Sequence, residues 1–367
     1  MSNLQVLLLE GDGIGPEVVC ETTKVMELFS AETDLSFEIE SAEFGGASID
    51  AFGVPLTDSV VSLAKEADAV LLGAVGGPKW DEVASDVRPE RGLLSLRAQM
   101  GVFANLRPAR FFESLAASSP LRPELIEGVE FIFVRELTGG IYFGEPRGVS
   151  IEDGIRRGVS SMVYDENEIR RVGKIAFEIA RKRKKRLVSV DKANVLEVQR
   201  LWREVITEQS AEYPDVELEH YYVDNCAMQL VTGPAQFDVV VTGNMFGDIL
   251  SDAAAAMTGS LGMLPSASVG VGGGLFEPVH GSAPDIAGLG KANPLAAILS
   301  FGMMLEYSAG RPELARVVHD SVDAVLGQGL RTPDIASVHY NQQEKLVGTR
   351  EMGEAVLREC RAHLARL

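Results

Sequence analysis

The sequence predicts an α/β protein of roughly two domains, with at least one largely parallel sheet. Hydrophobic residues make up 46% of its 367 residues and aromatic residues only 7%, a balance that is typical of α/β enzymes. Strand and helix patterns alternate from the N-terminus onward, which favours parallel strands joined by helices. A chain of this length can bury a sizeable core and corresponds to about two domains.

The alternation can be followed from the first residues. An apolar run at 6–9 indicates a strand, and residues 16–29 repeat apolar side chains at helical spacing, with Pro16 in the first turn. The same reasoning predicts strands at 37–42 and 69–72 and a helix at 56–66. Further along, it predicts a helix at 168–180 and strands at 131–135, 187–190, 218–223 and 237–242.

The domain organisation is predicted from changes in this pattern. Asn105 to Pro108 marks an expected crossing into a second domain, and after about residue 258 the chain is expected to return to the first. We therefore predict one discontinuous domain of residues 1–104 and 258–367 and a second domain of residues 105–257. The glycine-rich segment 270–274 is predicted to be a loop and not a domain linker.

The charge balance argues against some partners. The chain has 34 Lys and Arg residues against 53 Asp and Glu residues, a net charge of −19, which would repel nucleic acid. One cationic run at 181–186 resembles a nucleic-acid or localisation patch, but it closes the predicted helix at 168–180. Because cations favour helix C-termini, a solvated helix end explains the run better.

Further features predict a cytoplasmic protein that binds no membrane. No apolar run approaches the ~20 residues that a membrane-spanning helix needs, and the N-terminus lacks the charged region and cleavage site of a signal peptide. The three cysteines, Cys20, Cys226 and Cys360, lack the spacing of metal or redox motifs, which suits a reducing compartment.

A glycine-rich turn lies between the first predicted strand and helix. Gly11, Gly13 and Gly15 suggest a dinucleotide-binding fingerprint, in which glycines admit a pyrophosphate to a helix N-terminus. The third glycine comes one residue too early, however, and Pro16 occupies the helix start. We therefore predict a tight loop that lets a ligand or a neighbouring backbone approach closely, and not the standard fingerprint.

Two aspartates follow the predicted strand at 237–242. Asp248 and Asp252 are four residues apart, so they lie on one face if the segment that holds them is a helix. Open α/β sheets bind ligands at the carboxyl ends of their strands, and two carboxylates there would suit Mg²⁺ or Mn²⁺. The alternative is that both aspartates only stabilise a helix N-terminus.

Three arginines are candidate carboxylate ligands. Arg97, Arg107 and Arg135 occur in the segments LLSLR, NLRP and VRELT, and arginine suits bidentate binding of carboxylates. Together they fit a dicarboxylate substrate, although a structural salt bridge is the better explanation for any one of them taken alone.

Three more polar residues follow a turn or a predicted strand. Tyr142 follows a Gly–Gly pair, Lys192 follows the strand at 187–190, and Asp224 follows the strand at 218–223. A buried lysine there could have a lowered pKa and serve as a proton shuttle, and Asp224 adds a third carboxylate. Each has an ordinary structural explanation when taken singly. Together with the arginines and the aspartate pair, they indicate an active site.

Five longer segments resemble the isocitrate/isopropylmalate dehydrogenase family of metal-dependent β-decarboxylating dehydrogenases. They are GDGIGPE at 11–17, ELTGGIYFG at 136–144, DKANV at 191–195, NMFGDILSD at 244–252 and EPVHGSAPDIAG at 277–288. The resemblance covers nearly the whole chain in order. It implies a two-domain α/β fold with a large mixed, largely parallel sheet flanked by helices, which differs from the standard Rossmann fold.

The resemblance also implies roles for individual residues. The catalytic residues would be Tyr142 and Lys192, the metal ligands Asp224, Asp248 and Asp252, and the substrate ligands Leu93, Arg97, Arg107, Arg135 and Asp224. Loops 77–90 and 281–293 of the first domain would bind the nicotinamide cofactor, with contacts from Gly77, Glu90, Glu277, His280, Gly281, Ser282, Ala283, Pro284, Asp285, Ile286 and Asn293. A homodimer is implied, in which Lys192 and Asp224 reach the active site of the partner subunit.

Three features favour the isopropylmalate branch of the family and NAD as its cofactor. Leu93 and Leu94 offer an apolar surface for an isopropyl group where isocitrate enzymes have more polar residues, and the segment LTGGI at 137–141 is typical of this branch. Asp285–Ile286 stands where relatives that use NADP tend to have Lys–Tyr, and a carboxylate there would repel a 2′-phosphate. The expected reaction is oxidative decarboxylation of 3-isopropylmalate to 4-methyl-2-oxopentanoate, in leucine biosynthesis.

Several alternatives stay open. The substrate could be tartrate, malate, isocitrate or homoisocitrate, and a plain hydroxy-acid dehydrogenase would need no metal. A catalytically silent regulatory subunit is disfavoured because Tyr142, Lys192 and the three aspartates are all present. Two segments depart from the family pattern: residues 270–274 are unusually rich in glycine, and residues 147–162 are a candidate for an arm that links subunits.

Overall fold

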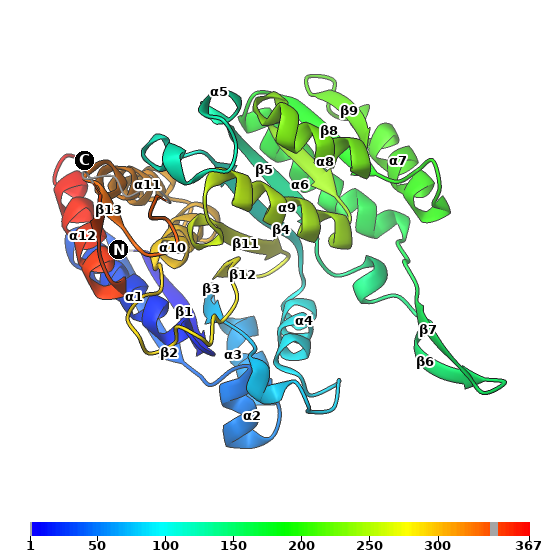
Figure 1. Ribbon diagram of the computed structural model, residues 1–367, viewed down its shortest axis with the longest axis horizontal. Helices are drawn as coiled ribbons and strands as arrows, with labels where there is room; N and C mark the ends of the chain where they lie inside the picture. Colours follow the sequence, from blue (N-terminus) through cyan, green and yellow to red (C-terminus); the bar gives the residue numbers. More distant parts are fainter. Residues whose placement is uncertain (1, 338–343) are drawn as a thin grey trace. The chain divides into compact units, whose positions relative to one another are not determined.

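The computed structural model describes residues 2–337 and 344–367. Its internal contacts divide the chain into two compact units (Figure 1): unit 1 comprises Met1–Val102, Phe111–Pro120 and Ala255–Leu367, and unit 2 comprises Phe103–Arg110 and Leu121–Ala254. Ten strands, five in each unit, make up a mixed and largely parallel sheet flanked by helices. The predicted fold class is therefore confirmed.

Five strands belong to unit 1, in the order β2-β1-β3-β12-β11. Their bounds are β1 (Ser2–Gly11), β2 (Leu35–Ser41), β3 (Ala69–Ala74), β11 (Pro265–Gly270) and β12 (Gly274–Pro278). Neighbouring strands are parallel except for β11 and β12. Every residue of β3 is buried, as expected of a parallel strand that is covered on both faces.

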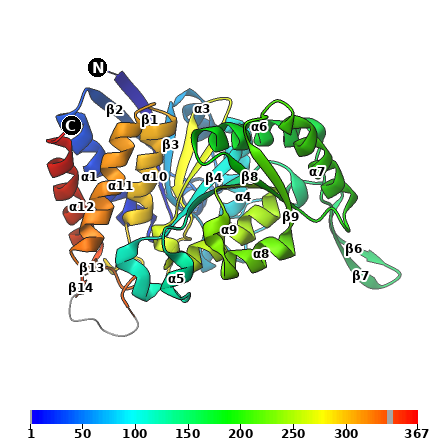
Figure 2. The ribbon, with the colours of Figure 1, turned by 90° about the horizontal axis from the view of Figure 1, so that it is seen from above.

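Unit 1 also contains a packed layer of four helices and a group of shorter helices and strands. In the layer, α1 (Gly15–Glu32), α10 (Leu295–Tyr307), α11 (Pro312–Gly327) and α12 (Thr349–Leu364) lie side by side (Figure 2). Because α10 is buried from Leu295 to Leu305, it forms the centre of this layer. The shorter elements are α2 (Gly46–Phe52), α3 (Asp58–Glu66), α4 (Pro89–Met100), β13 (Leu330–Arg331) and β14 (Lys345–Leu346).

Unit 2 has the strand order β4-β5-β10-β8-β9. Its strands are β4 (Val102–Arg110), β5 (Glu130–Glu136), β8 (Arg186–Asp191), β9 (Glu217–Tyr222) and β10 (Val239–Thr242). The antiparallel pair is β4 and β5; β5, β10, β8 and β9 run parallel. The carboxyl ends of these four strands therefore meet at one edge of the sheet, where ligands are expected in α/β folds.

Five helices connect or follow these strands: α5 (Pro123–Ile126), α6 (Glu166–Lys182), α7 (Glu197–Ser210), α8 (Val223–Thr232) and α9 (Asn244–Thr258). The start of α6 is fixed by a capping box, in which Asp165 and Glu168 each accept the other's backbone N–H at 2.9 Å. The cationic run begins in its last turn, where Arg181 pairs with Asp215. This placement agrees with the interpretation of the run as a helix end.

Residues 147–160 of unit 2 form a two-stranded hairpin, β6 (Arg147–Glu152) and β7 (Ile155–Ser160). It stands apart from the other elements of its unit in both ribbon views (Figures 1 and 2). Val149, Ile151 and Ile155 are at least 70% exposed on it. These side chains form an exposed apolar surface on the hairpin, and an isolated hairpin is marginally stable by itself.

No helix in the described part of the chain is long and apolar enough to cross a membrane.

Candidate active site

The parallel strands of unit 2 each lead to a predicted site residue. Tyr142 lies in a short turn after β5, Lys192 comes directly after β8, and Asp248 and Asp252 lie on α9 after β10. Asp224 was expected beside a strand end, and it lies in the first turn of α8, which begins one residue after β9.

Two arginines and two aspartates form the centre of this edge. Arg107 on β4 donates a hydrogen bond of 3.0 Å to Asp252 and lies 3.4 Å from an oxygen of Asp248, while Arg135 on β5 pairs with Asp248. Because one guanidinium contacts both carboxylates, the two aspartates face the same way, as their spacing predicted. We call these four residues the arginine–aspartate cluster.

The cluster places buried positive charge beneath accessible negative charge. Arg107 and Arg135 are 6% and 3% exposed, whereas the side chains of Asp248 and Asp252 are 33% and 51% exposed. Burial raises the pKa of Asp252, and the charge of Arg107 opposes this shift. A divalent cation bound to these carboxylates would favour their ionised form further. The accessible oxygens suit a hard cation, since oxygen is its preferred ligand.

Tyr142 is joined to this cluster through its hydroxyl group. The hydroxyl donates a hydrogen bond of 3.0 Å to Asp248, and the tyrosine ring lies 5.9 Å from the guanidinium carbon of Arg135. Burial and the neighbouring Asp248 carboxylate raise the pKa of Tyr142. The phenol therefore keeps its proton at neutral pH, as a proton donor must.

Lys192 and Asp224 form a second group, joined by an ion pair of 2.5 Å. The ammonium group of Lys192 lowers the pKa of Asp224. In the described residues of this single chain, no three His, Cys, Asp or Glu side chains are grouped closely enough to hold a metal ion. Asp224 is therefore not brought together with Asp248 and Asp252 within one chain.

A half-buried arginine links the strand ends next to this second group. Arg203 on α7 makes two hydrogen bonds, of 2.8 and 2.9 Å, to the buried carboxylate of Asp191, the residue before Lys192. Its guanidinium carbon also lies 4.8 Å from the ring centroid of Tyr222, two residues before Asp224. One side chain thus links the ends of β8 and β9.

A buried network behind the arginine–aspartate cluster was not predicted from the sequence. Asn244, at the start of α9, accepts hydrogen bonds of 2.8 and 3.0 Å from Arg135, and its backbone N–H donates to the Tyr164 hydroxyl at 2.8 Å. Glu136 is also buried and accepts the backbone N–H of Gly139 at 2.8 Å. The position of Asn244 before Asp248 offered a signal, whereas Tyr164 lies in no motif.

In unit 1, the predicted substrate ligands lie on α4. Leu93 is half-buried and lies one turn before Arg97, which is 8% exposed and pairs with Glu277 of β12 at 2.5 Å. Such an ion pair is the structural explanation that any single arginine invites. The Nε atom of Arg97, however, is buried without a hydrogen-bond partner among the described residues.

The predicted cofactor loop 281–293 combines anchored and exposed residues. The carbonyl of Ser282 accepts the backbone N–H of Ile14 at 2.8 Å, and Ile286 packs against a core cluster that includes Ile14 and Val18. Gly281, Pro284 and Asp285 are exposed, whereas Ala283 is half-buried with a positive φ of 37°. The anchored residues fix the loop, and the exposed ones are available to a ligand.

The other predicted cofactor residues differ in their exposure and in which of their polar atoms are already hydrogen-bonded. The Nδ1 atom of His280 lies 2.9 Å from the Gly281 carbonyl, and its Nε2 atom is buried without a partner among the described residues. The amide of Asn293 is engaged with Asp334 and with the backbone of Leu295, both at 3.0 Å. Gly77 and Glu90 lie on either side of an exposed segment that leads into α4, and Glu90 itself is exposed.

Comparison with known proteins gives a consistent result. Residues 5–356 match the family model of isocitrate/isopropylmalate dehydrogenases. The chain is 57% identical to 3-isopropylmalate dehydrogenase of Pseudomonas fluorescens over 96% of this chain and 98% of that protein. It is 58% identical to 3-isopropylmalate dehydrogenase of Gloeobacter violaceus over 96% and 97%. Isocitrate dehydrogenase from Methylococcus capsulatus shares its fold with a TM-score of 0.85 at 34% identity, over 98% of this chain and 100% of that one. The chain belongs to the isocitrate/isopropylmalate dehydrogenase family.

Proposed function

We propose that the chain is an enzyme of leucine biosynthesis that oxidises and decarboxylates 3-isopropylmalate to 4-methyl-2-oxopentanoate and CO₂, with NAD as the oxidant. The observation that carries this proposal is the identity of 57% over 96% of the chain to proteins named 3-isopropylmalate dehydrogenase. The arginine–aspartate cluster with Tyr142 supports it, because it supplies cationic, carboxylate and proton-donating groups in one place.

The resemblance implies that Arg97, Arg107 and Arg135 would bind the two carboxylates of the malate group. Arg107 and Arg135 are held in place by buried partners, so they lose little conformational freedom when substrate binds. The Nε donor of Arg97 has no hydrogen-bond partner among the described residues. The half-buried Leu93 and Leu94 would contact the isopropyl group, for which burial replaces hydrogen bonding.

Mg²⁺ or Mn²⁺ would be held by Asp248 and Asp252 together with Asp224 of the partner subunit. The donor set fits this ion, because all three ligands are carboxylates and the first two face the same way. When bound, the metal supplies Lewis acidity at the substrate hydroxyl and its adjacent carboxylate.

Two side chains of the protein would move the protons. Lys192, in its neutral amine form, would accept the proton of the C2 hydroxyl, directly or through water, as C2 is oxidised. The 2-oxo acid that results has a carboxylate β to its ketone, and this carboxylate leaves as CO₂ while its bonding electrons stay on carbon. Tyr142, which keeps its proton because its pKa is raised, then protonates that carbon.

NAD would be bound by loops 77–90 and 281–293 of unit 1. Two observations support a fit: His280 has a buried Nε2 atom without a partner among the described residues, and the Asp285 carboxylate is exposed and could accept hydrogen bonds from ribose hydroxyls. A carboxylate at this position repels the 2′-phosphate of NADP. When bound, NAD accepts the hydride.

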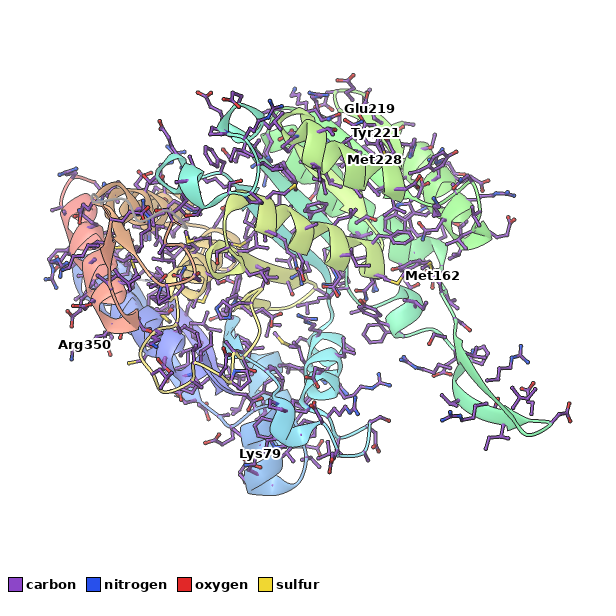
Figure 3. All side chains as sticks on the ribbon, in the orientation of Figure 1. Lys79, Met162, Glu219, Tyr221, Met228 and Arg350 are labelled. Carbon is purple, nitrogen blue, oxygen red and sulfur yellow. The ribbon has the colours of Figure 1, made fainter. Side chains whose placement is uncertain are left out.

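We further propose a cytoplasmic homodimer whose two active sites are shared. The free state of all three cysteines suits a reducing compartment. Apolar side chains are exposed on α8, where Met228 is 64% exposed (Figure 3), on α9, where Ile249 is 61% exposed, and on the hairpin of β6 and β7. A second copy of the chain would bury them and bring its own Lys192 and Asp224.

The first experiment follows NADH formation by the purified protein with 3-isopropylmalate and Mg²⁺, and with isocitrate, tartrate and malate in parallel. We expect turnover of 3-isopropylmalate alone, and its loss when a chelator is added. Turnover of another acid would overturn the assignment of Leu93, and activity that survives chelation would overturn the metal site.

Mixing two inactive variants tests the shared site. Tyr142→Phe and Lys192→Ala chains, refolded together in equal amounts, should recover up to about a quarter of the wild-type activity, because half of the dimers are hybrids with one intact site. No recovery despite hybrid formation would place Tyr142 and Lys192 in the same subunit's site.

A further inference from the structure

We infer that the glycine turn of residues 11–17 is a platform that positions both proposed NAD loops, with Asp12 and Glu17 as its positioning residues. This inference rests on the proposed function, because it takes loops 77–90 and 281–293 as the NAD site. Neither carboxylate needs to contact NAD. Each accepts hydrogen bonds from backbone N–H groups in or next to a loop. The turn, which does not match the standard dinucleotide fingerprint, would thus still contribute to NAD binding.

Glu17 holds the second loop. Its carboxylate accepts the backbone N–H of Gly288, and the N–H of Gly290 at 3.1 Å. Both glycines have positive φ, 74° and 63°, and a Cβ on either would meet no atom within 4 Å among the described residues beyond its chain neighbours. The Gly290 carbonyl is held separately, because it accepts the backbone N–H of Thr349 at 2.9 Å. The Glu17 carboxylate adds the contact to the N–H groups of both glycines.

Asp12 holds the segment that leads into the first loop. It is 4% exposed, and its carboxylate accepts three backbone N–H groups, from Gly46, Ala47 and Gly76, each at 2.8 Å. Gly76 comes directly before Gly77, the first residue of the proposed cofactor loop. A buried carboxylate with three such donors is a rigid anchor, because hydrogen bonds to an ionised group are stronger than neutral ones.

The glycines of the turn admit neighbouring backbone. A Cβ on Gly13 would lie 2.0 Å from the carbonyl oxygen of Ser282, and one on Gly11 would lie 1.9 Å from that of Ala74. Hydrogen bonds form at the same places: Ile14 N–H donates to Ser282 and Asp12 N–H donates to Ala74, both at 2.8 Å. The close approach that the sequence predicted is therefore an approach of backbone from both sides.

Fixing the loops in advance should strengthen NAD binding. A loop that is ordered only when ligand binds reduces affinity by the entropy lost in ordering it. Glu17→Gln keeps one carbonyl oxygen but replaces the charged acceptor and offers an amide N–H to a backbone N–H. The Gly288–Gly290 segment would then be less well ordered before NAD binds, and ordering it would reduce the affinity for NAD.

The test measures NAD binding to the full-length dimer by calorimetry, and separately the Michaelis constant for each substrate. For Glu17→Gln we expect NAD affinity to fall about 5- to 50-fold, while kcat at saturating NAD and the Michaelis constant for isopropylmalate change less than about 2-fold. Glu17→Asp retains the charge, but its side chain is too short to reach both N–H groups. Its affinity for NAD should therefore lie between those of the wild type and of Glu17→Gln. Glu27→Gln makes the same charge change at an exposed position of α1 and serves as the control.

The outcomes are distinct. Unchanged NAD affinity in folded Glu17→Gln and Glu17→Asp would overturn the inference, and so would an equal loss of affinity for isopropylmalate, which indicates general damage. If wild-type protein itself fails to bind NAD, the proposed cofactor is wrong and the inference falls with it. If Glu17→Gln does not fold, the result for Glu17→Asp decides.

Discussion

Unit 1 fixes the loops of the proposed cofactor site mainly through backbone groups, whereas unit 2 assembles the proposed reaction centre from side chains. In unit 1, Asp12 and Glu17 accept backbone N–H groups, and Ile14 pairs with the carbonyl of Ser282. In unit 2, Arg107 and Arg135 contact the carboxylates of α9 directly. The two constructions should fail in different ways.

A surface built from backbone depends on shape. It tolerates changes of side chain except where a Cβ would occupy the space of another backbone segment. A centre built from side chains depends on charge and hydrogen-bonding groups, because an unpaired buried charge is expensive to leave in place. Substitutions that alter either backbone fit or side-chain chemistry, but not both, can therefore distinguish the two constructions.

The largest effect is expected for Tyr142→Phe in unit 2. The ring remains but the hydroxyl that donates to Asp248 is lost, so kcat should fall about 10²- to 10⁴-fold, the range for general acid–base groups. NAD affinity should stay unchanged in calorimetry. Tyr213→Phe is the matched control, because Tyr213 lies in unit 2, is 6% exposed and stacks on Phe177. A fall of less than about 10-fold for Tyr142→Phe would remove it from the chemistry.

The next largest effect is expected for Gly13→Ala in unit 1. Gly13 has a φ of +59°, and its Cβ would meet the Ser282 carbonyl, so the free energy of unfolding should fall by about 2–4 kcal/mol. Urea unfolding measures this change. Gly327→Ala is the control, since a Cβ on this glycine at the end of α11 would meet nothing within 4 Å in the part of the chain that the structure describes. An equally small effect of both substitutions would show that close backbone approach does not govern unit 1.

Tyr164→Phe sharpens the comparison, because it removes a backbone contact within unit 2. The Asn244 N–H would lose its acceptor in a buried place, which should reduce the free energy of unfolding by about 1–3 kcal/mol. Since Asn244 also holds Arg135, kcat should fall as well. The Tyr213→Phe control is 6% exposed, as Tyr164 is. Normal kcat in Tyr164→Phe would show that the side-chain cluster keeps its geometry without this support.

The smallest effect concerns pH and is shared by both units. Burial lowers the pKa of His280 in unit 1 and of His220 in unit 2. Below pH about 6.5 the unfolded chain binds protons that the folded chain does not. Stability that is present above this pH is therefore lost as pH falls, by at most about 1.4 kcal/mol per pH unit for each histidine.

His220→Gln should flatten that dependence. We expect a smaller slope of unfolding free energy between about pH 6.5 and 5 than in the wild type, measured by urea unfolding at several pH values. His319→Gln provides a histidine substitution in the other unit for comparison. An unchanged slope in His220→Gln would assign the pH dependence to other groups.

The sequence was sufficient for features that depend on local periodicity. The four-residue spacing of Asp248 and Asp252 predicted a common face, and Arg107 contacts both. Alternating apolar runs predicted the parallel strands of both units, because strands and helices have different side-chain periods. The irregular glycine spacing at 11–15 correctly predicted close backbone approach. The roles of the individual site residues remain predictions that the experiments above test.

Only the tertiary structure decided which distant groups became partners. Glu17 meets Gly288 and Gly290 from more than 270 positions away in the chain, and Tyr164, which lies in no motif, accepts the N–H of Asn244. The sequence by itself determined the fold class, the family and the kind of functional group at each candidate site position, since these follow from local patterns. It did not determine the Asp12 anchor, the Arg203 link or the Tyr164 network. Hydrogen bonds are short and directional, so such pairs exist only after packing has fixed the backbone on both sides.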